Sequence, residues 1–591
     1  MDRLRTTRTL LLFCSLITWC GCVVLAAPPE VIKPQAPLYT VVRGEHGVIL
    51  LTKNGDRFEV ISTVEQARAW SGDAPNFKVP AGTPPSTQLL LDSSGVLHAF
   101  SLKARGDGRK PAVDFFIDLW HSRTEDNGAR WSESKPYFEG YVGDVLDFDQ
   151  LPNGRIVVPF AYWVPGLEDG PPVGSNRTTS VVSDDGGATW SKPVSALTSP
   201  CYPDHNGSNN GAVEPGILPL RDGRIWMLMR TQAGFLYQSF SRDGVNWAEA
   251  ASSRFHSSSG PPSLLRLPDG RIAVFWNNCE MPPREQGQGV YGGRDAIHAA
   301  ISDDEGRTWQ GFREFYRDRR RNETPPHSGD RGTAYPISGS SKDGKMVVLA
   351  GQGGSGRNVI FIDPDWLTET HASDDFSNGL DAWSVFKEFG PASGWWRDRC
   401  QGPELIDHPT KPGAKVMHVR RPDDKHPDAA VWNFPNGRRG VLSVRLMPRE
   451  GFGGGNLALT NRFFNPNDVR GDSLAMFSLS LPTDGLLGKK PALRTGTMHT
   501  IKLAWDIDRH RCDVRVDGQQ VTSLALLNST DNGVSYLRLA STAAEIDPAG
   551  FIVESVDVVI EEARTLPGEP GIDIPPESPS PATHGVRHES P

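Results

Sequence analysis

Ser302-Asp-Asp304-Glu-Gly306-Arg-Thr-Trp309 is the stretch that decides the fold, because its pattern occurs three more times upstream. The other copies run from Thr124 to Trp131, from Ser183 to Trp190 and, one residue shorter, from Ser241 to Trp247. In such a stretch the Asp and Ser/Thr side chains bind nearby backbone amides, and Gly adopts the positive φ of a tight turn. The Trp can then bury a large flat surface between neighbouring units. We therefore expect four structural turns, named Asp turns here, on the outer rim of the molecule.

The Asp turns belong to a larger repeat. Their tryptophans lie 59, 57 and 62 residues apart, and a period of this size is typical of repeat architectures. A second motif interleaves with them, at Leu151-Pro-Asn-Gly154-Arg, Leu220-Arg-Asp-Gly223-Arg and Leu267-Pro-Asp-Gly270-Arg, with looser copies around Gly95 and Gly344. Asn-Gly or Asp-Gly between apolar runs indicates a β-hairpin. Each unit is thus an inner hairpin followed by an outer hairpin that an Asp turn closes.

Five such units and an N-terminal strand pair, at 39–42 and 47–51, predict an all-β fold with a six-bladed β-propeller over residues 38–368. Downstream, short alternating strands separated by turns predict a β-sandwich over residues 373–563. The residues from 564 to 591 are rich in Pro, Ser and Glu, and they are expected to form a disordered tail.

The ends and the overall charge narrow the possible partners. Arginines precede an apolar stretch from Leu10 to Ala26, which predicts a signal peptide over residues 1–26 and a secreted or periplasmic protein. No other segment is apolar enough to span a bilayer. A net charge of −9 argues against a nucleic-acid partner.

Four cysteines follow the signal peptide, namely Cys201, Cys279, Cys400 and Cys512. Two alternatives stay open: these cysteines form the disulfide bonds Cys201–Cys279 and Cys400–Cys512, or they are free thiols. No Cys/His spacing indicates a zinc site, and we expect no metal and no cofactor.

The Asp turns and blade hairpins resemble the sialidase (neuraminidase) superfamily over roughly residues 38–368. In that family arginines hold the carboxylate of an acidic sugar, and a guanidinium fork matches a carboxylate bidentately. Arg230, in Trp226-Met-Leu-Met-Arg-Thr, resembles the second of these arginines, and Arg294, in Gly-Gly-Arg-Asp-Ala-Ile, resembles the third. The resemblance therefore implies that both bind substrate.

The same resemblance implies a Tyr nucleophile and a Glu that activates it. Tyr335, in Gly-Thr-Ala-Tyr-Pro, and Glu214, in Gly-Ala-Val-Glu-Pro-Gly, stand where the family has them. A phenol is a weak nucleophile unless a base takes its proton, so the two side chains are expected to meet.

Two positions depart from the family pattern. The family's first arginine has no counterpart in the stretch 81–88, and Lys78 or Arg105 could substitute for it. The general acid is assigned to Asp114, with Asp107 as the alternative, because aromatic neighbours could keep such a carboxyl protonated.

The resemblance implies an exported retaining exo-glycosidase that hydrolyses terminal sialic acid or a related acidic sugar on a glycan or glycoconjugate. Two alternatives stay open: a non-catalytic carbohydrate-binding propeller, and a glycosidase of different sugar specificity. The sequence leaves the linkage, the ligand of the second domain and the oligomeric state open. It also predicts that the second domain resembles the concanavalin-A/laminin-G-like jelly rolls, on Met498-His-Thr-Ile-Lys-Leu-Ala-Trp-Asp506 and the Asp-Gly hairpin at 517–518.

Overall fold

The structure is a computed structural model of the 591-residue chain. It describes residues 26–32, 38–44, 47–54, 57–61, 77–78, 88–126, 128–166, 174–202, 210–279, 294–317, 321–322, 333–341, 343–351, 358–393 and 396–571, with the backbone alone at 38–78 and 388–398. The predicted signal peptide, apart from Ala26, lies outside these residues. Among the helices of the described part, none combines the length and the apolar character that crossing a membrane requires.

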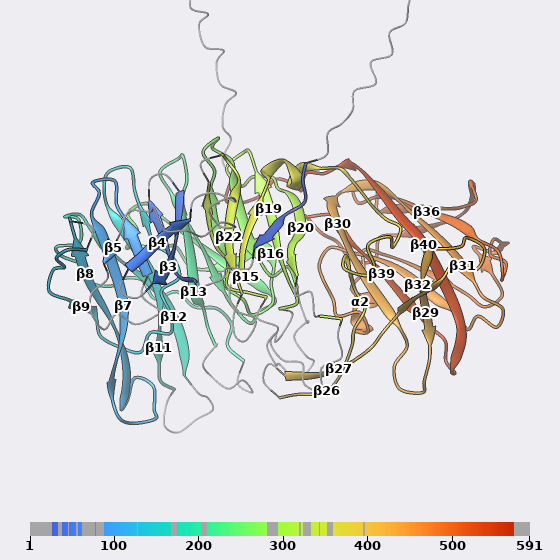
Figure 1. Ribbon diagram of the computed structural model, residues 1–591, viewed down its shortest axis with the longest axis horizontal. Helices are drawn as coiled ribbons and strands as arrows, with labels where there is room; N and C mark the ends of the chain where they lie inside the picture. The colour runs from blue at the N-terminus through green and yellow to red at the C-terminus, as the bar shows by residue number, and fades with distance from the viewer. Residues whose placement is uncertain are drawn as a thin grey trace, which may run out of the picture.

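The described residues of the first domain, which is the blue-to-yellow half of Figure 1, form five β-sheets. One sheet has eight strands: β5 (Phe77–Lys78), β4 (Arg57–Ile61), β3 (Gly47–Asn54), β2 (Leu38–Gly44), β6 (Gln88–Leu91), β7 (Leu97–Gly106), β8 (Phe115–Thr124) and β9 (Lys135–Phe138). A parallel pairing of β2 with β6 joins its two antiparallel halves. Divided at that pairing, the strands of this domain fall into six groups.

The other four sheets follow in chain order. They contain β10 (Asp149–Gln150), β11 (Ile156–Val164) and β12 (Ser175–Ser183); then β13 (Val213–Pro219), β14 (Ile225–Arg230), β15 (Phe235–Ser241) and β16 (Ala251–His256); then β17 (Ser263–Arg266), β18 (Ile272–Trp276), β19 (Ala296–Ser302) and β20 (Gln310–Arg317); and last β21 (Ile337–Ser340), β22 (Met346–Ala350) and β23 (Asn358–Ile362). An N-terminal strand that the sequence did not predict, β1 (Glu30–Ile32), completes the last sheet by pairing antiparallel with β23.

The Asp turns form as their side chains predict. In the second turn, Ser183 Oγ donates to Asp185 Oδ1 at 2.8 Å, and the amides of Gly187 and Thr189 donate to these two side chains. The glycine has a φ of 80°, which favours Gly at this position. Equivalent bonds close the turns at Thr124, Ser241 and Ser302.

The Trp of each of the last three Asp turns packs on the preceding unit, as predicted. Trp190 lies 5.6 Å from the ring centre of Phe100, and Trp247 Nε1 donates to Ser180 Oγ at 2.7 Å. Trp309 is fully buried and lies 5.2 Å from Phe255. The tryptophans of these Asp turns therefore stabilise the contacts between neighbouring units.

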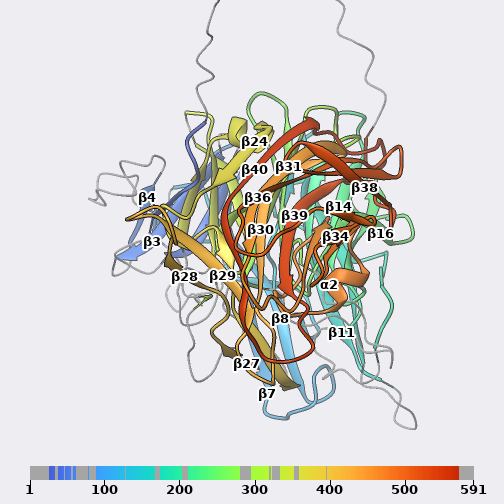
Figure 2. The ribbon, with the colours of Figure 1, turned by 90° about the vertical axis from the view of Figure 1, so that its right-hand side faces the viewer.

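The second domain is a β-sandwich, which faces the viewer in Figure 2. One sheet contains β24 (His371–Asp374), β28 (Glu404–Asp407), β29 (Lys415–Arg421), β40 (Asp547–Glu562), β31 (Arg439–Pro448), β36 (His499–Asp506), β37 (Arg511–Val516) and β38 (Gln519–Ala525). The other contains β25 (Trp383–Ser384), β30 (Ala429–Gly437), β39 (Val534–Ser541), β32 (Gly455–Thr460) and β33 (Phe477–Leu481). The hairpins β26–β27 (Lys387–Ser393, Trp396–Cys400) and β34–β35 (Leu486–Leu487, Lys490–Pro491), the 3-10 turn η2 (Pro364–Thr368) and the short helix α2 (Arg470–Ser473) complete the chain.

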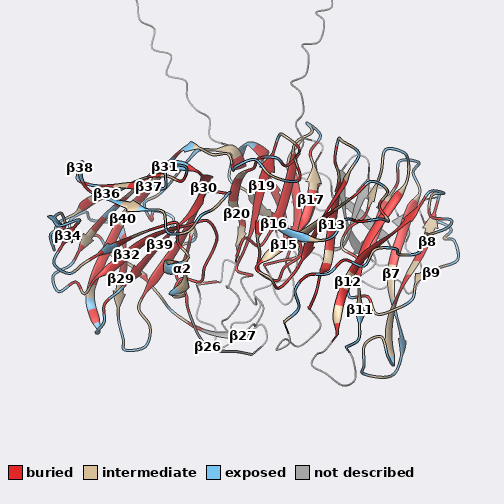
Figure 3. Cartoon of the chain, turned by 180° about the vertical axis from the view of Figure 1, so that it is seen from behind, coloured by how far each residue is buried: buried red, intermediate tan, exposed pale blue. Residues whose placement is uncertain are grey.

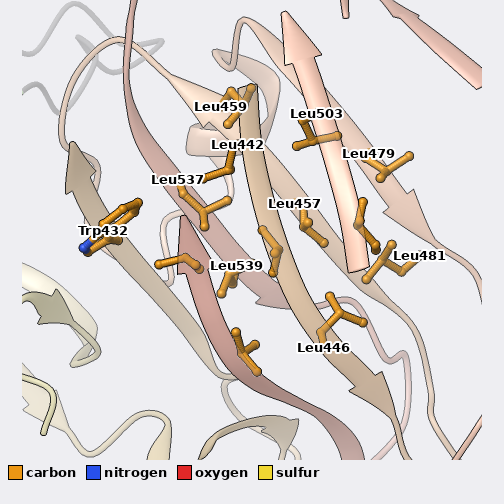
Figure 4. Close-up of a cluster of buried hydrophobic side chains, with 14 of the residues drawn as sticks. Trp432, Leu442, Leu446, Leu457, Leu459, Leu479, Leu481, Leu503, Leu537 and Leu539 are labelled. Carbon is orange, nitrogen blue, oxygen red and sulfur yellow. The ribbon is translucent and has the colours of Figure 1, made fainter. Parts of the chain in front are cut away.

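Leucines from both sheets fill the space between them, as Figure 4 shows for Leu442, Leu446, Leu457, Leu503 and Leu539, each at most 1% exposed. Figure 3 shows that the strands of both domains are buried along most of their length. Most of the buried apolar residues of the sandwich thus form a core of its own, whereas the boundary near 368–373 and the jelly-roll resemblance stay predictions.

The two domains share a buried polar interface, which the sequence did not predict. Asn433 of β30 accepts the amide of Glu314 at 2.8 Å and donates to Phe312 O on β20. The hydroxyl of Tyr536 donates to Glu314 Oε1 at 2.6 Å and also bonds His298 of β19. Burial of so many hydrogen-bonded groups indicates that the domains are fixed against each other.

Two further expectations need correction or completion. The tail was predicted to begin at residue 564, but residues 564–571 contact the first domain. Arg564 pairs with Asp303 at 2.6 Å, and Thr565 Oγ1 accepts the amide of Trp309 at 3.0 Å. The four cysteines are all free thiols, so of the two alternatives the structure has the unpaired one.

Candidate active site

Four of the five predicted site residues lie at or close to the ends of strands in three successive sheets. Glu214 is the second residue of β13, and Arg230 is the last residue of the adjacent β14. Tyr335 precedes β21 by two residues, and Arg294 precedes β19 by two residues. Because β13 neighbours β17, and β17 neighbours β21, their ends bring these side chains to one place.

Glu214, Tyr335 and Arg230 form a closed set of hydrogen bonds. The Tyr335 hydroxyl donates to Glu214 Oε1 at 2.8 Å. Arg230 Nη1 donates to Glu214 Oε2 at 2.7 Å and to the Tyr335 hydroxyl oxygen at 3.1 Å. The contact expected between the phenol and the carboxylate is therefore present.

The two arginines meet at Ser259, a residue that the sequence did not single out. Arg230 Nε donates to Ser259 Oγ at 3.0 Å, and Arg294 Nη2 donates to Ser259 O at 2.7 Å. The Arg294 guanidinium also lies 5.3 Å from the centre of the Tyr335 ring. Both arginine side chains are almost completely buried, at 2% and 4% exposed residue surface. Two guanidinium groups thus lie beside the Tyr335 side chain, one at its hydroxyl and one at its ring.

Glu214 and Tyr335 share an unusual backbone conformation. Their φ angles are 46° and 58°, in the left-handed region that residues with a Cβ rarely adopt. At Glu214 the pairing of β13 with β14 shifts register between Val213 and Gly216, which is a β-bulge. Bulges redirect a side chain from its place in the regular sheet, and strained backbone of this kind gathers at functional sites. Each residue also precedes a proline, a position that disfavours the α-helical conformation.

The electrostatic environment keeps the phenol protonated. Burial, and after it the charge of Glu214, raises the pKa of Tyr335 to about 12, although Arg230 and Arg294 act in the opposite direction. Burial on its own would lower the pKa of Arg230, but Glu214 and Tyr335 raise it above its ordinary value. The proton of the phenol therefore stays on the oxygen at neutral pH, next to a carboxylate that can accept it.

The structure does not bring the remaining predicted residues to this place. Asp114 is exposed at the tip of the β7–β8 hairpin, where its Oδ1 accepts the amide of Lys110 at 2.6 Å. Asp107 is exposed on the same tip. Within the described residues, neither has a hydrogen bond or ion pair to the four clustered side chains.

The substitutes for the missing first arginine are also absent from the cluster. Arg105 is half-exposed, and it pairs with the buried Asp118 at 2.8 Å and stacks on the Phe116 ring. Among the described contacts it has none to the four clustered side chains, so its part in the arginine set stays a prediction. The side chain of Lys78 lies outside the described residues.

Asn277 is a second residue that the sequence analysis missed. Its Nδ2 donates to Ala296 O at 2.7 Å and to Thr333 O at 2.8 Å, so it links the segments that carry Arg294 and Tyr335. A Cβ on Gly260 would lie 2.5 Å from Asn277 Oδ1, so the loop after Ser259 needs glycine there. The run Ser257-Ser-Ser-Gly-Pro-Pro262 before an inner strand was the available signal. In the described ranges no three His, Cys, Asp or Glu side chains are placed to hold a metal ion.

Comparisons with known proteins found one family match and several similar solved structures. Residues 76–348 match the family described as BNR repeat-like domain. No curated protein sequence matches the chain. Among solved structures, it is similar to Trypanosoma rangeli sialidase, with 13% identity and a TM-score of 0.35 over 90% of this chain and 96% of that chain. It is also similar to a Dyadobacter fermentans protein of unknown function, with 14% identity and a TM-score of 0.38 over 57% of this chain and 98% of that chain.

Proposed function

We propose that this chain is a relative of the sialidases and a retaining exo-glycosidase for an acidic sugar; the match of residues 76–348 to the BNR repeat-like domain supports this. The observation that carries the proposal is the 2.8 Å hydrogen bond from the Tyr335 hydroxyl to Glu214, with Arg230 bound to both. A phenol, a base and a guanidinium in mutual contact are the groups that such a reaction requires.

In the first step Tyr335 attacks the anomeric carbon of the sugar. The bond from that carbon to the phenolic oxygen forms while the bond to the aglycone oxygen breaks. The proton of the phenol passes to Glu214, so the nucleophile does not have to exist as a free anion at neutral pH. Neutral attack suits a sugar that carries a carboxylate next to the reacting carbon, because two anions would repel each other.

In the second step water attacks the same carbon, gives its proton to the carboxylate that protonated the aglycone, and releases Tyr335, which recovers its own proton from Glu214. Two displacements at one carbon return the original anomeric configuration. The leaving aglycone needs a proton in the first step, and we assign this to Asp114, with Asp107 as the alternative, on the exposed β7–β8 tip that could approach a bound glycan.

Arg230 and Arg294 are proposed to bind the sugar carboxylate. Both are buried, permanently charged and fixed on Ser259, so binding requires little reorganisation of the site. A water-poor surrounding strengthens the attraction between a guanidinium and a carboxylate.

One observation favours a different acidic sugar as substrate. Of the described arginines, Arg230 and Arg294 contact Tyr335, whereas Arg105 pairs with Asp118 and has no described contact with the phenol. A uronic-acid glycoside, with a smaller acidic unit, is therefore the second candidate.

The test compares fluorescent 4-methylumbelliferyl glycosides of sialic acid and of uronic acids. Release from either acidic series, absent from matched neutral glycosides, supports the proposal and selects the sugar. A protein that cleaves no acidic glycoside contradicts it and leaves the carbohydrate-binding alternative.

A further inference from the structure

The residue after the site arginine is anchored to the other domain. Asp295 directly follows Arg294, and its carboxylate accepts both arms of the Arg399 guanidinium, at 2.7 Å from Nη1 and 3.0 Å from Nη2. Arg399 belongs to strand β27 of the sandwich domain. The side chains of this pair are only 4% and 2% exposed.

The geometry makes this contact directional. Two parallel hydrogen bonds from a planar fork fix the orientation of a carboxylate, which one bond from an ammonium group would not do. The guanidinium also stacks at 3.7 Å on the ring of Phe386, which is fully buried. Phe386 belongs to a small apolar cluster that spans both domains, with Cys279 from the first domain and Phe463 and Tyr536 from the second. Arg399 therefore has little freedom to follow a movement of Asp295.

The hairpin that carries Arg399 is itself tied to the sandwich. Lys387, at the start of β26, pairs across the hairpin with Cys400. Its Nζ donates to Asp428 Oδ1 at 3.0 Å and to His426 O at 3.2 Å, and the Lys387–Asp428 pair is buried. Figure 1 shows β26 and β27 at the lower edge of the molecule, between the two domains. The sandwich thus provides a fixed support for the segment at Asp295.

The two site arginines differ in their support. Arg230 ends a strand in the middle of its own sheet and bonds Glu214 from the neighbouring strand. Arg294 stands before β19 begins, and the next residue is bound across the domain interface. A displacement of Asp295 would therefore move Arg294 relative to Ser259 and the Tyr335 ring.

We propose that Arg399 is a positioning residue: through Asp295 it orients Arg294, so that the site for the acidic sugar is complete only with the second domain in place. This inference rests on the proposed function, because it assigns to Arg294 the binding of the substrate carboxylate. It gives the sandwich a role in the same reaction, separate from any ligand of its own.

The experiment measures KM and kcat of the full chain on the fluorescent acidic glycoside that the wild-type protein cleaves. Arg399→Ala should raise KM by about tenfold or more and leave kcat within about threefold, since it loosens a group that binds substrate and not the nucleophile. Arg399→Lys keeps the charge but not the fork, and Asp295→Asn keeps the size but not the charge, so both should give intermediate KM values.

Asn433→Ala is the matched control. It removes the buried hydrogen bonds that join Asn433 to the backbone of Glu314 and Phe312 on β20, across the same interface. It leaves Asp295 and Arg399 unchanged. It should lower the melting temperature and leave KM within about twofold of the wild-type value. A merely structural role of Arg399 would give the same result as this control.

Three outcomes overturn the inference. One is an Arg399→Ala protein with wild-type KM. If that variant does not fold, unchanged KM values in both Arg399→Lys and Asp295→Asn overturn it instead. The third is an increase in KM for Asn433→Ala as large as that for Arg399→Ala, which would reduce the effect to general loosening of the interface. A wild-type protein without activity on any acidic glycoside is distinguishable from these, because it refutes the proposed function and the inference falls with it.

Discussion

Replacing Tyr335 with Phe separates catalysis from stability at the candidate site. The change removes one oxygen and keeps the ring that lies beside Arg294. It deletes the hydrogen bond to Glu214 at 2.8 Å and the bond from Arg230 at 3.1 Å. Glu214 and Arg230 remain paired with each other at 2.7 Å, so neither becomes a buried charge without a partner.

The expected loss of stability follows from these contacts. A hydrogen bond to a charged group contributes about 1.5–3 kcal/mol, and less where the partner stays satisfied. We therefore expect the free energy of unfolding to fall by about 1–2 kcal/mol. The catalytic effect should be larger. Without its nucleophile the enzyme should turn over about 10³-fold more slowly or worse, which corresponds to about 4 kcal/mol of activation free energy.

The assay is release of 4-methylumbelliferone from the acidic glycoside that the wild-type protein prefers, with unfolding followed by circular dichroism. Tyr137→Phe, on the outer strand β9, is the matched control and should keep wild-type turnover. A Tyr335→Phe protein that is folded and retains turnover within about tenfold of wild type would refute the assignment of Tyr335 as nucleophile.

Three other predictions concern the site and the fold. Arg230→Lys keeps a positive charge but loses the bond geometry to Glu214 and Ser259, so KM for the acidic glycoside should rise by about tenfold or more, and an unchanged KM would exclude Arg230 from carboxylate binding. The pKa of Tyr335 is raised to about 12 in the folded protein, against about 10 in the unfolded chain, so the protonated phenol stabilises the folded state fully below pH 10 and this contribution is lost as the pH rises towards 12. In urea unfolding measured from pH 10 to pH 12, the wild-type protein should therefore lose about 2 kcal/mol more free energy of unfolding than Tyr335→Phe, and equal losses would contradict the shift. Trp309→Ala should lower the free energy of unfolding by about 3–5 kcal/mol in the same measurement, since the ring is fully buried against the preceding unit, and a loss below about 1 kcal/mol would show that the Asp-turn tryptophans do not fasten the units.

The repeats could be predicted because their chemistry is local. Ser183, Asp185 and Gly187 determine their turn by contacts within a few residues, and the spacing of the copies then indicates the architecture. The closing strand β1 was missed because three residues, Glu30–Ile32, carry no pattern of their own and become a strand only by pairing with β23.

The candidate site likewise contains residues that the sequence could predict and residues that it could not. Glu214, Arg230, Arg294 and Tyr335 could be found because each stands in a stretch that resembles a family. Ser259 contributes through its hydroxyl and its backbone carbonyl, and Asn277 through its side-chain amide. All these bonds join distant segments, and such roles leave little trace in residue type. Asp295 and Arg399 are 104 positions apart, and no spacing rule relates them.

The pairing of β1 with β23 has a consequence for how the chain folds. It joins residue 30 to residue 361, a separation whose closure costs about 5 kcal/mol of chain entropy if the intervening units are still unfolded. Each hairpin, by contrast, closes over a few residues, so the units can form one by one as they are synthesised. Until residues 358–362 have been synthesised, β1 lacks its partner strand β23. From then until β1 pairs with it, β23 is an open sheet edge that can recruit a strand from another chain. We therefore expect the pairing of β1 with β23 to be a late and slow event of folding. Changes in β1 should delay refolding and promote aggregation while leaving the chemistry of the finished protein untouched.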